Sequence, residues 1–276
     1  ERAAAAQAGA AAALPGRIEW ATDPGPAADP GPATDPRPDS APGPSAAPAP
    51  EAGGGRRVAL SGVGKAAAAV FTRWRREIPE ATIWVDVDAT PLVALRERTE
   101  PGLLAYLARF TVAALREFPV FNSRYDAERQ EIVHLDRINL GIAVQGARGL
   151  VVPAVVGAET LTTTELGVGI RRVVAAARAG TSTPAELTAG TFTLNDYGVF
   201  DVDGGAPILN PPQVAMLGVG RIIDRPWVVE GAVVVRKVAQ LSFVFDHRVC
   251  DGETASRFLR RVADAVENPA AALAHL

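Results

Sequence analysis

Cysteine, methionine and histidine are scarce in this chain of 276 residues, which has one cysteine (Cys250), one methionine (Met216) and three histidines. A single cysteine excludes an intramolecular disulfide and a zinc site built from several cysteines. We therefore predict no metal site, and we expect a cytoplasmic location, because low cysteine use fits a reducing compartment; a secreted protein with few cysteines would have the same composition. Since the chain begins with Glu1 and its methionine lies at position 216, we expect it to be part of a longer protein.

An excess of basic charge and a long apolar run are also missing. The formal net charge is −3, whereas proteins that bind nucleic acid usually carry a basic domain or stripe. No run approaches the roughly 18 apolar residues that a membrane span needs. We therefore expect neither nucleic acid nor membrane as a partner. Hydrophobic residues make up 48% of the chain, which is enough for a sizeable core.

Proline is unevenly distributed. Residues 1–55 contain half of the 22 prolines, are rich in alanine and repeat the string DPGPA. Such a segment cannot bury enough apolar surface to offset the entropy lost on ordering, so we predict a disordered, semi-stiff Ala/Pro-rich linker over 1–55. An inert tail and a swinging tether for other domains both fit this composition. Residues 56–276 are predicted to form one folded domain.

Apolar residues at a period near 3.6, together with capping residues, predict five helices in this domain. Ser61 is placed to cap the first helix. Thr162 and Glu165 have the spacing of a capping box at the start of the fourth. The predicted helices cover 61–79, a stretch that starts at Thr90-Pro91, and residues 101–118, 160–180 and 253–269.

Alternating or continuous apolar stretches predict the strands. The stretch ATIWVDVD, residues 81–88, places Ile83, Val85 and Val87 on one face. Glu230-Gly231 is predicted to be the tight turn of a hairpin. Further strands are predicted over 134–145, 149–157, 191–200, 214–223, 226–229 and 232–245. The expected fold is α/β, a two-layer sandwich of helices on one large mixed β-sheet.

The stretch FDHRVCDG, residues 245–252, places His247 at the end of a predicted strand and between two aspartates. Gly252 permits a sharp turn before the next helix. Histidine changes protonation state near neutral pH and therefore suits a general base. A buried histidine that is satisfied by a backbone carbonyl is the alternative for an isolated residue of this kind.

The spacing of His247, Asp251 and Gly252 resembles the HxxxDG signature of the chloramphenicol acetyltransferase-like acyltransferases. The longer string LSFVFDHRVCDG is similar to the E2 components, the dihydrolipoamide acyltransferases, of 2-oxo acid dehydrogenase complexes. The strings GIAVQGARGLVVPAV and GTFTLNDYGVFDVDGGAPILNPPQVAMLGVGRI are similar to further segments of that family, in the same order. The resemblance covers residues 57–276 and implies a chloramphenicol acetyltransferase-like fold, with the tail as a tether.

The resemblance implies acyl transfer between S-acyl-dihydrolipoamide and coenzyme A, with His247 deprotonating the thiol of coenzyme A. Asn195 stands where many members have a serine that stabilises the oxyanion. An amide can also donate, Thr193 is the competing donor, and a turn former is the other role open to Asn195. Asp251 is then mainly structural, and Arg248 either holds it or faces solvent. The reaction needs no covalent enzyme intermediate, so Cys250 is not expected to act as a nucleophile.

Arg248, Ser242 and Gly198 are predicted on the same resemblance to contact coenzyme A. The family also implies a homotrimer with the site between subunits, and it leaves open a larger cage of trimers. The lipoyl group and the contacts to the E1 and E3 components belong to domains that this sequence does not contain. A further departure is Glu80, where the family often has histidine. The string GVFDVDGGAPILNPP favours the branched-chain type; a structural scaffold and a freestanding CoA-dependent acetyltransferase are the alternatives.

Overall fold

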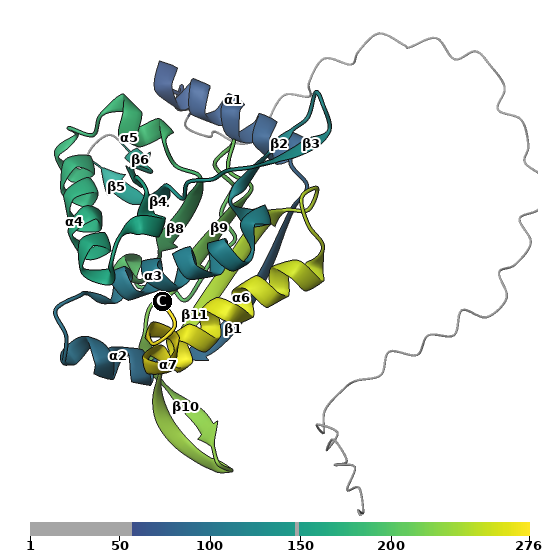
Figure 1. Cartoon of the computed structure of the whole chain (residues 1–276). Helices are drawn as coiled ribbons and strands as arrows, with labels where there is room; N and C mark the ends of the chain where they lie inside the picture. The colour runs from purple at the N-terminus through teal and green to yellow at the C-terminus, as the bar shows by residue number, and fades with distance from the viewer. Residues whose placement is uncertain (1–56, 147–148) are drawn as a thin grey trace, which may run out of the picture. The chain divides into compact units, whose positions relative to one another are not determined.

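A mixed β-sheet organises the folded unit of the chain, Val58–Leu276 (Figure 1). The computed structural model describes residues 57–146 and 149–276, so the predicted linker over 1–55 lies outside the described residues. Within them the sheet has seven strands. Their order is β1 (Glu80–Asp88), β11 (Ala232–Asp246), β9 (Ala215–Val219), β8 (Phe192–Asp196), β4 (Leu140–Ile142) and β7 (Ala154–Val155), with β10 (Ile223–Val229) paired to β11.

Strand β8 pairs in parallel with both β4 and β9, and the other pairs of this sheet are antiparallel. The expected large mixed sheet is therefore confirmed. Strands β10 and β11 form a long hairpin that extends away from the helices in Figure 1. Its turn is formed by Glu230 and Gly231, with φ angles of 51° and 82°. Both angles are positive, as a tight hairpin turn requires, which confirms that prediction.

Helices cover one face of the sheet (Figure 1). They are α2 (Thr90–Glu97), α3 (Leu103–Glu117), α4 (Thr163–Ala179), α6 (Gly252–Glu267) and α7 (Pro269–Leu273). The core beneath them is aromatic, and neighbouring ring centroids lie 4.6–6.5 Å apart. These rings belong to Phe121, Phe192, Phe243, Phe245 and Phe258, all nearly or fully buried.

The predicted caps are confirmed. The Ser61 hydroxyl accepts a hydrogen bond from the Gly64 N–H at 3.2 Å and begins α1 (Gly62–Glu77). Thr162 and Glu165 form the reciprocal bonds of a capping box at the start of α4. The short helix α5 (Pro184–Thr188), which the apolar pattern did not predict, also begins with a capping box. Each cap satisfies backbone N–H groups that have no partner inside the helix.

The prediction of one strand over 134–145 is wrong. Part of this stretch belongs to β3 (Glu131–His134), which pairs with β2 (Ser123–Asp126), and part to β5 (Val144–Gly146), which pairs with β6 (Gly149–Val151). Only Leu140–Ile142 joins the large sheet, as β4. The Asn122 amide donates to the carbonyls of Leu135 and Arg137 at 2.8 and 3.0 Å. Side-chain bonds of this kind occupy backbone groups that a continuous ladder would need.

Two other predicted strands are shorter than expected. Strand β8 ends at Asp196 because its carboxylate accepts from the Gly198 N–H at 2.8 Å and starts the 3₁₀ helix η3 (Gly198–Phe200). The stretch 149–157 is divided between β6 and β7 at Pro153, which has no backbone donor for a ladder. On the sheet face opposite the helices, Leu209 packs with Met216 and Val244, beside Ile78.

Candidate active site

His247 follows β11 directly, where the chain turns towards α6. Its backbone N–H donates to the Pro79 carbonyl at 3.0 Å, and the N–H of Val249 donates to the Asp246 carbonyl at 3.1 Å. The residue is exposed, its ring lies 5.6 Å from that of Phe245, and its imidazole forms no hydrogen bond with the residues that the structure describes. The alternative of a buried, internally satisfied histidine is therefore wrong. Hydrogen bonds thus fix the backbone at His247, and the imidazole ring is exposed.

An ion pair holds the turn around His247. The guanidinium of Arg248 donates from Nε and Nη2 to the buried carboxylate of Asp246 at 2.9 and 2.6 Å. Its other side lies over the ring of Tyr125, with 4.2 Å from Cζ to the ring centroid. The bond to Asp246 raises the pKa of Arg248 further, so the guanidinium stays charged. The sequence placed Asp246 beside His247 but gave no sign that Tyr125 lies here.

Asp251 does not pair with Arg248, so that option is wrong. Its carboxylate caps α6 by accepting from the Thr254 N–H at 2.9 Å. This hydrogen bond lowers the pKa of the Asp251 carboxyl, and the nearby His247 contributes a smaller lowering. The structural role predicted for Asp251 thus has a physical form: the carboxylate fixes the start of the helix that follows His247. Its part in catalysis stays a prediction.

Burial raises the pKa of the Cys250 thiol to about 12, and the carboxylates of Asp251 and Asp246 add to the effect. The thiol is therefore protonated at neutral pH and is a poor nucleophile.

We expect Cys250→Ala to keep acyl transfer within about twofold of the unaltered chain. Alkylation of Cys250 by iodoacetamide at pH 8 is expected to be much slower than alkylation of free cysteine. A variant without activity, or fast alkylation, would contradict this assignment.

A cavity of about 480 Å³ lies beside β8 and β9, at the packed cluster of Leu209 and Met216. Helix α1 forms one wall with Phe71 and Trp74. The volume of the cavity is in the range of sites for small ligands. The full lining is Phe71, Trp74, Ala143, Leu150, Val151, Val152, Leu187, Thr193, Asn195, Pro207, Ile208, Leu209, Asn210 and Met216, of which only Thr193, Asn195 and Asn210 are polar.

Two predicted oxyanion donors, Thr193 and Asn195, both line this cavity. The hydroxyl of Thr193 donates its one proton to Gln213 Oε1 at 2.6 Å and is fully buried. The Asn195 amide forms no hydrogen bond within the described part of the chain, so its donors are available. The turn after β8 is made by the Asp196 carboxylate, which bonds the Gly198 N–H. Asp196 therefore forms the turn, and the amide of Asn195 has open donors in the cavity wall; its role as oxyanion donor stays a prediction.

Gly198 follows Tyr197 in the chain, and the Ser242 hydroxyl lies next to the Tyr197 phenol. Asn195, Gly218 and Ser242 form one row across β8, β9 and β11. A side chain at Gly218 would overlap both the Ser242 hydroxyl and the Tyr197 ring. Burial raises the pKa of the Tyr197 phenol, an effect that the neighbouring Ser242 hydroxyl partly offsets, yet neither hydroxyl reaches regular hydrogen-bond geometry with any described residue. Contacts of Ser242, Gly198 and Arg248 with coenzyme A stay predictions.

The strand register separates His247 from Asn195. Asn195 is level with Ser242 through Gly218, and His247 follows Ser242 by five residues (247 − 242 = 5). At about 3.3 Å per residue, His247 lies roughly 16 Å farther along the sheet, and two steps of about 4.8 Å between strands add to that. The two side chains of one chain therefore do not reach the same acyl carbon.

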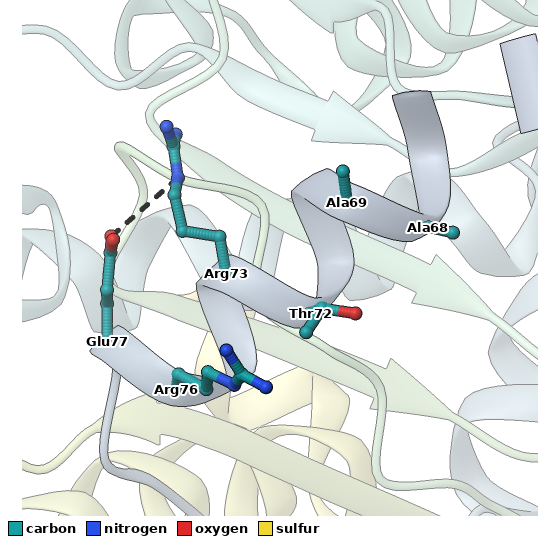
Figure 2. Close-up of a pocket in the computed structure, with 6 residues that line it drawn as sticks. All are labelled: Ala68, Ala69, Thr72, Arg73, Arg76 and Glu77. Carbon is teal, nitrogen blue, oxygen red and sulfur yellow. Dashed lines mark ion pairs between the residues drawn. The ribbon is translucent and has the colours of Figure 1, made fainter. Parts of the chain in front are cut away.

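A shallow hollow of about 590 Å³ lies on the outer face of α1 (Figure 2). Figure 2 shows its side chains on a single helix, with one ion pair between Arg73 and Glu77 at 3.8 Å. All of the lining residues are exposed, so the hollow has no opposite wall. We assign it no ligand. The residues that line the hollow are Ala68, Ala69, Thr72, Arg73, Arg76 and Glu77.

Residues 57–146 and 149–276 hold neither a cluster of metal ligands nor a membrane-spanning helix. In these ranges no three side chains of His, Cys, Asp or Glu gather as ligands for a metal ion. No helix there has the length and apolarity to cross a membrane.

Comparison with known proteins matches residues 52–274 to the family described as 2-oxoacid dehydrogenases acyltransferase (catalytic domain). The lipoamide acyltransferase component of the branched-chain alpha-keto acid dehydrogenase complex of Pseudomonas aeruginosa is 37% identical over 222 residues, which is 77% of this chain and 52% of that protein. The acetyltransferase component of the pyruvate dehydrogenase complex of Acholeplasma laidlawii is 32% identical over 77% of this chain and 41% of its own length. This chain therefore spans about half of these relatives, or less.

Solved structures also match this chain. The cubic core of the pyruvate dehydrogenase multienzyme complex matches with a TM-score of 0.74 and 25% identity, over 82% of this chain and 99% of that one. The dihydrolipoamide acetyltransferase of Azotobacter vinelandii matches with a TM-score of 0.72 and 26% identity, over 82% of this chain and 99% of that one. That structure concerns the role of a serine, a histidine and an asparagine in the catalytic mechanism, the last two being four positions apart.

Proposed function

The chain belongs to the family of 2-oxoacid dehydrogenase acyltransferase catalytic domains, and from this premise we propose that it transfers an acyl group between S-acyl-dihydrolipoamide and coenzyme A. The observation that carries the proposal is that His247 has an exposed imidazole on a fixed turn. Its imidazole is open to a substrate, while Asp246, Arg248 and the Pro79 carbonyl fix the turn that presents it. His247 and Asp251 also have the spacing of the histidine and the asparagine of the Azotobacter enzyme.

In the proposed reaction, a nitrogen of His247 takes the proton from the thiol of coenzyme A. The thiolate attacks the carbonyl carbon of the acyl thioester, and a carbon–sulfur bond forms as the carbonyl oxygen becomes an oxyanion. The Asn195 amide donates to this oxyanion, where preorganised donors have their largest effect. The intermediate then breaks its other carbon–sulfur bond. The departing sulfur of dihydrolipoamide takes the proton from the His247 imidazolium, which restores the neutral histidine.

We propose that two chains build each site. His247 and Asn195 of one chain lie too far apart along the sheet to act on one carbonyl, so the neighbouring chain supplies the second group. A homotrimer meets this need, because head-to-tail contacts in a closed ring give each interface one copy of each group. The match to a cubic core is consistent with trimers that assemble further.

The preferred acyl group in this proposal is short and branched. Eleven of the fourteen residues that line the cavity are apolar and none carries a charge. A branched hydrocarbon gains from burial against Leu209, Met216 and Ile208. The carboxylate of a succinyl group would find no cation there, and an unpaired buried charge is strongly unfavourable. This agrees with the branched-chain relative from Pseudomonas aeruginosa, although relatives that act in pyruvate complexes are similarly close.

Acyl transfer to free dihydrolipoamide from isobutyryl-, acetyl- and succinyl-CoA tests the proposal. We expect kcat/KM to be highest for isobutyryl-CoA and lower for acetyl-CoA by about tenfold or more, since each methylene in an apolar pocket contributes about 1–3 kcal/mol. Succinyl-CoA should be the poorest of the three. A preference for succinyl-CoA would contradict the branched-chain assignment but keep the acyltransferase. A trimeric protein that uses none of them would contradict the function itself.

A further inference from the structure

Glu80 is a buried carboxylate at the start of β1. Its side chain is 1% exposed. A carboxylate this deep is strongly unfavourable unless it is paired and hydrogen-bonded. Glu80 meets both conditions. Oε1 accepts from the backbone N–H of Leu209 at 2.8 Å, and Oε2 pairs with the guanidinium of Arg75.

The two partners of Glu80 belong to two different walls of the cavity. Arg75 follows Trp74 on α1, and Trp74 lines the cavity together with Phe71. Leu209 lies in the segment that supplies Pro207, Ile208, Leu209 and Asn210 to the lining. One buried side chain thus joins the helix wall to the segment wall.

Helix α1 has few other anchors at this end. Phe71 is 47% exposed, Arg73 and Arg76 are exposed, and Arg73 pairs locally with Glu77. Within the described residues, the segment that follows α1 is also held by Ile78, which packs beside Leu209 and Met216, and by the Pro79 carbonyl, which accepts from the His247 N–H at 3.0 Å. Of these contacts, the Glu80 link and the packing of Ile78 are the ones that reach Leu209, so we expect the spacing between Trp74 and Leu209 to depend on them.

We propose that Arg75 and Glu80 set the width of the acyl cavity, which makes Glu80 a positioning residue that determines acyl specificity. The inference rests on the proposed function, because it takes the cavity to be the acyl site. Glu80 does not touch the acyl group; it acts through Leu209 and Trp74. Without the link the two walls separate, contacts with a branched chain weaken, and a small acetyl group is less affected.

The test compares four variants in the isobutyryl-CoA and acetyl-CoA assay. Glu80→Ala removes both bonds of the link. Glu80→Gln keeps an oxygen for the Leu209 N–H and removes the charge that faces Arg75. Arg75→Ala removes the other half of the ion pair from an exposed position. Arg76→Ala is the matched control, because Arg76 is on the same turn, projects from the outer face of α1 in Figure 2 and has no ion pair with a described residue.

We expect Glu80→Ala and Arg75→Ala to reduce the ratio of kcat/KM for isobutyryl-CoA to that for acetyl-CoA by about tenfold, mainly through KM for isobutyryl-CoA. Glu80→Gln should fall between them and the unaltered protein, and Arg76→Ala should leave the ratio unchanged. A merely structural role would lower the melting temperature or the active fraction for both substrates alike, and the ratio would stay constant. That constant ratio in Glu80→Ala and Arg75→Ala would overturn the proposal.

Amide hydrogen exchange separates this outcome from a failure of the proposed function. The N–H of Leu209 should lose protection in Glu80→Ala and keep it in Arg76→Ala, whether or not the protein transfers acyl groups. If the exchange pattern changes as expected while the unaltered protein transfers nothing, the link is real and the proposed function is wrong, and the specificity role falls with it. If Leu209 is equally protected in both variants, the link itself is refuted.

Discussion

Replacement of His247 by alanine is expected to lower kcat for acyl transfer by about 10²–10⁴-fold, the usual contribution of a general base. The reason is that a free thiol is largely protonated at neutral pH, so the nucleophilic thiolate is rare without a base that takes its proton. KM for either substrate should change little, because the imidazole acts on the reacting thiol and does not fill the acyl cavity. Steady-state transfer from isobutyryl-CoA to dihydrolipoamide measures this loss.

The control for this variant is its stability. His247 is exposed and its anchoring bond comes from the backbone, so the melting temperature and the trimer should be unaffected. A matched variant, Arg248→Lys, keeps a positive charge but loses the two-pronged contact with Asp246. It should lower kcat less than His247→Ala. A His247→Ala protein that stays trimeric and retains full activity would contradict the proposed general base.

Replacement of Asn195 by alanine should lower kcat by about 10²–10³-fold, the effect of removing one oxyanion donor. The amide is the free donor on this face of β8, since the Thr193 hydroxyl is bonded to Gln213. Asn195→Ser restores a donor of the kind that many family members are expected to have, and should recover much of the lost rate. The comparison of kcat among these variants, at saturating isobutyryl-CoA, is the measurement.

Thr193→Val is the companion to the Asn195 variants, because it removes the competing donor and keeps the shape of the side chain. We expect it to reduce stability, because the buried Gln213 loses its partner, and to leave kcat of the folded protein far less affected than Asn195→Ala does. The opposite order, with Thr193→Val nearly inactive and Asn195→Ala active, would assign the oxyanion to Thr193 instead.

Local signals predicted much of the fold. The caps at Ser61 and Thr162 and the turn at Glu230-Gly231 depend only on neighbouring residues, and each was found as predicted. The division of residues 134–145 among three strands was not predictable in this way, because it depends on bonds between Asn122 and carbonyls more than ten positions later. A period of apolar residues carries no information about such side-chain partners.

The residues of the candidate site show the same difference between local and distant signals. His247 could be found from the sequence because its neighbours form a contiguous string. The partners of Arg248 and Glu80 could not, since they are set by packing between distant segments: Tyr125 meets Arg248, and Leu209 lies 129 positions after Glu80. The departure from the family at Glu80 was visible in the sequence, but its meaning required the buried position of the carboxylate. The lining of the acyl cavity likewise comes from dispersed parts of the chain.

The most direct test of the central claim, a site shared by two chains, is complementation between two inactive variants. His247→Ala and Asn195→Ala chains are refolded together in equal amounts, and the specific activity of the mixed trimers is compared with each variant alone. In random mixtures about one quarter of the interfaces pair an intact His247 with an intact Asn195 from the neighbour. We therefore expect about one quarter of the unaltered activity to return. Mixed trimers as inactive as either parent would contradict a site built from His247 of one chain and Asn195 of the next.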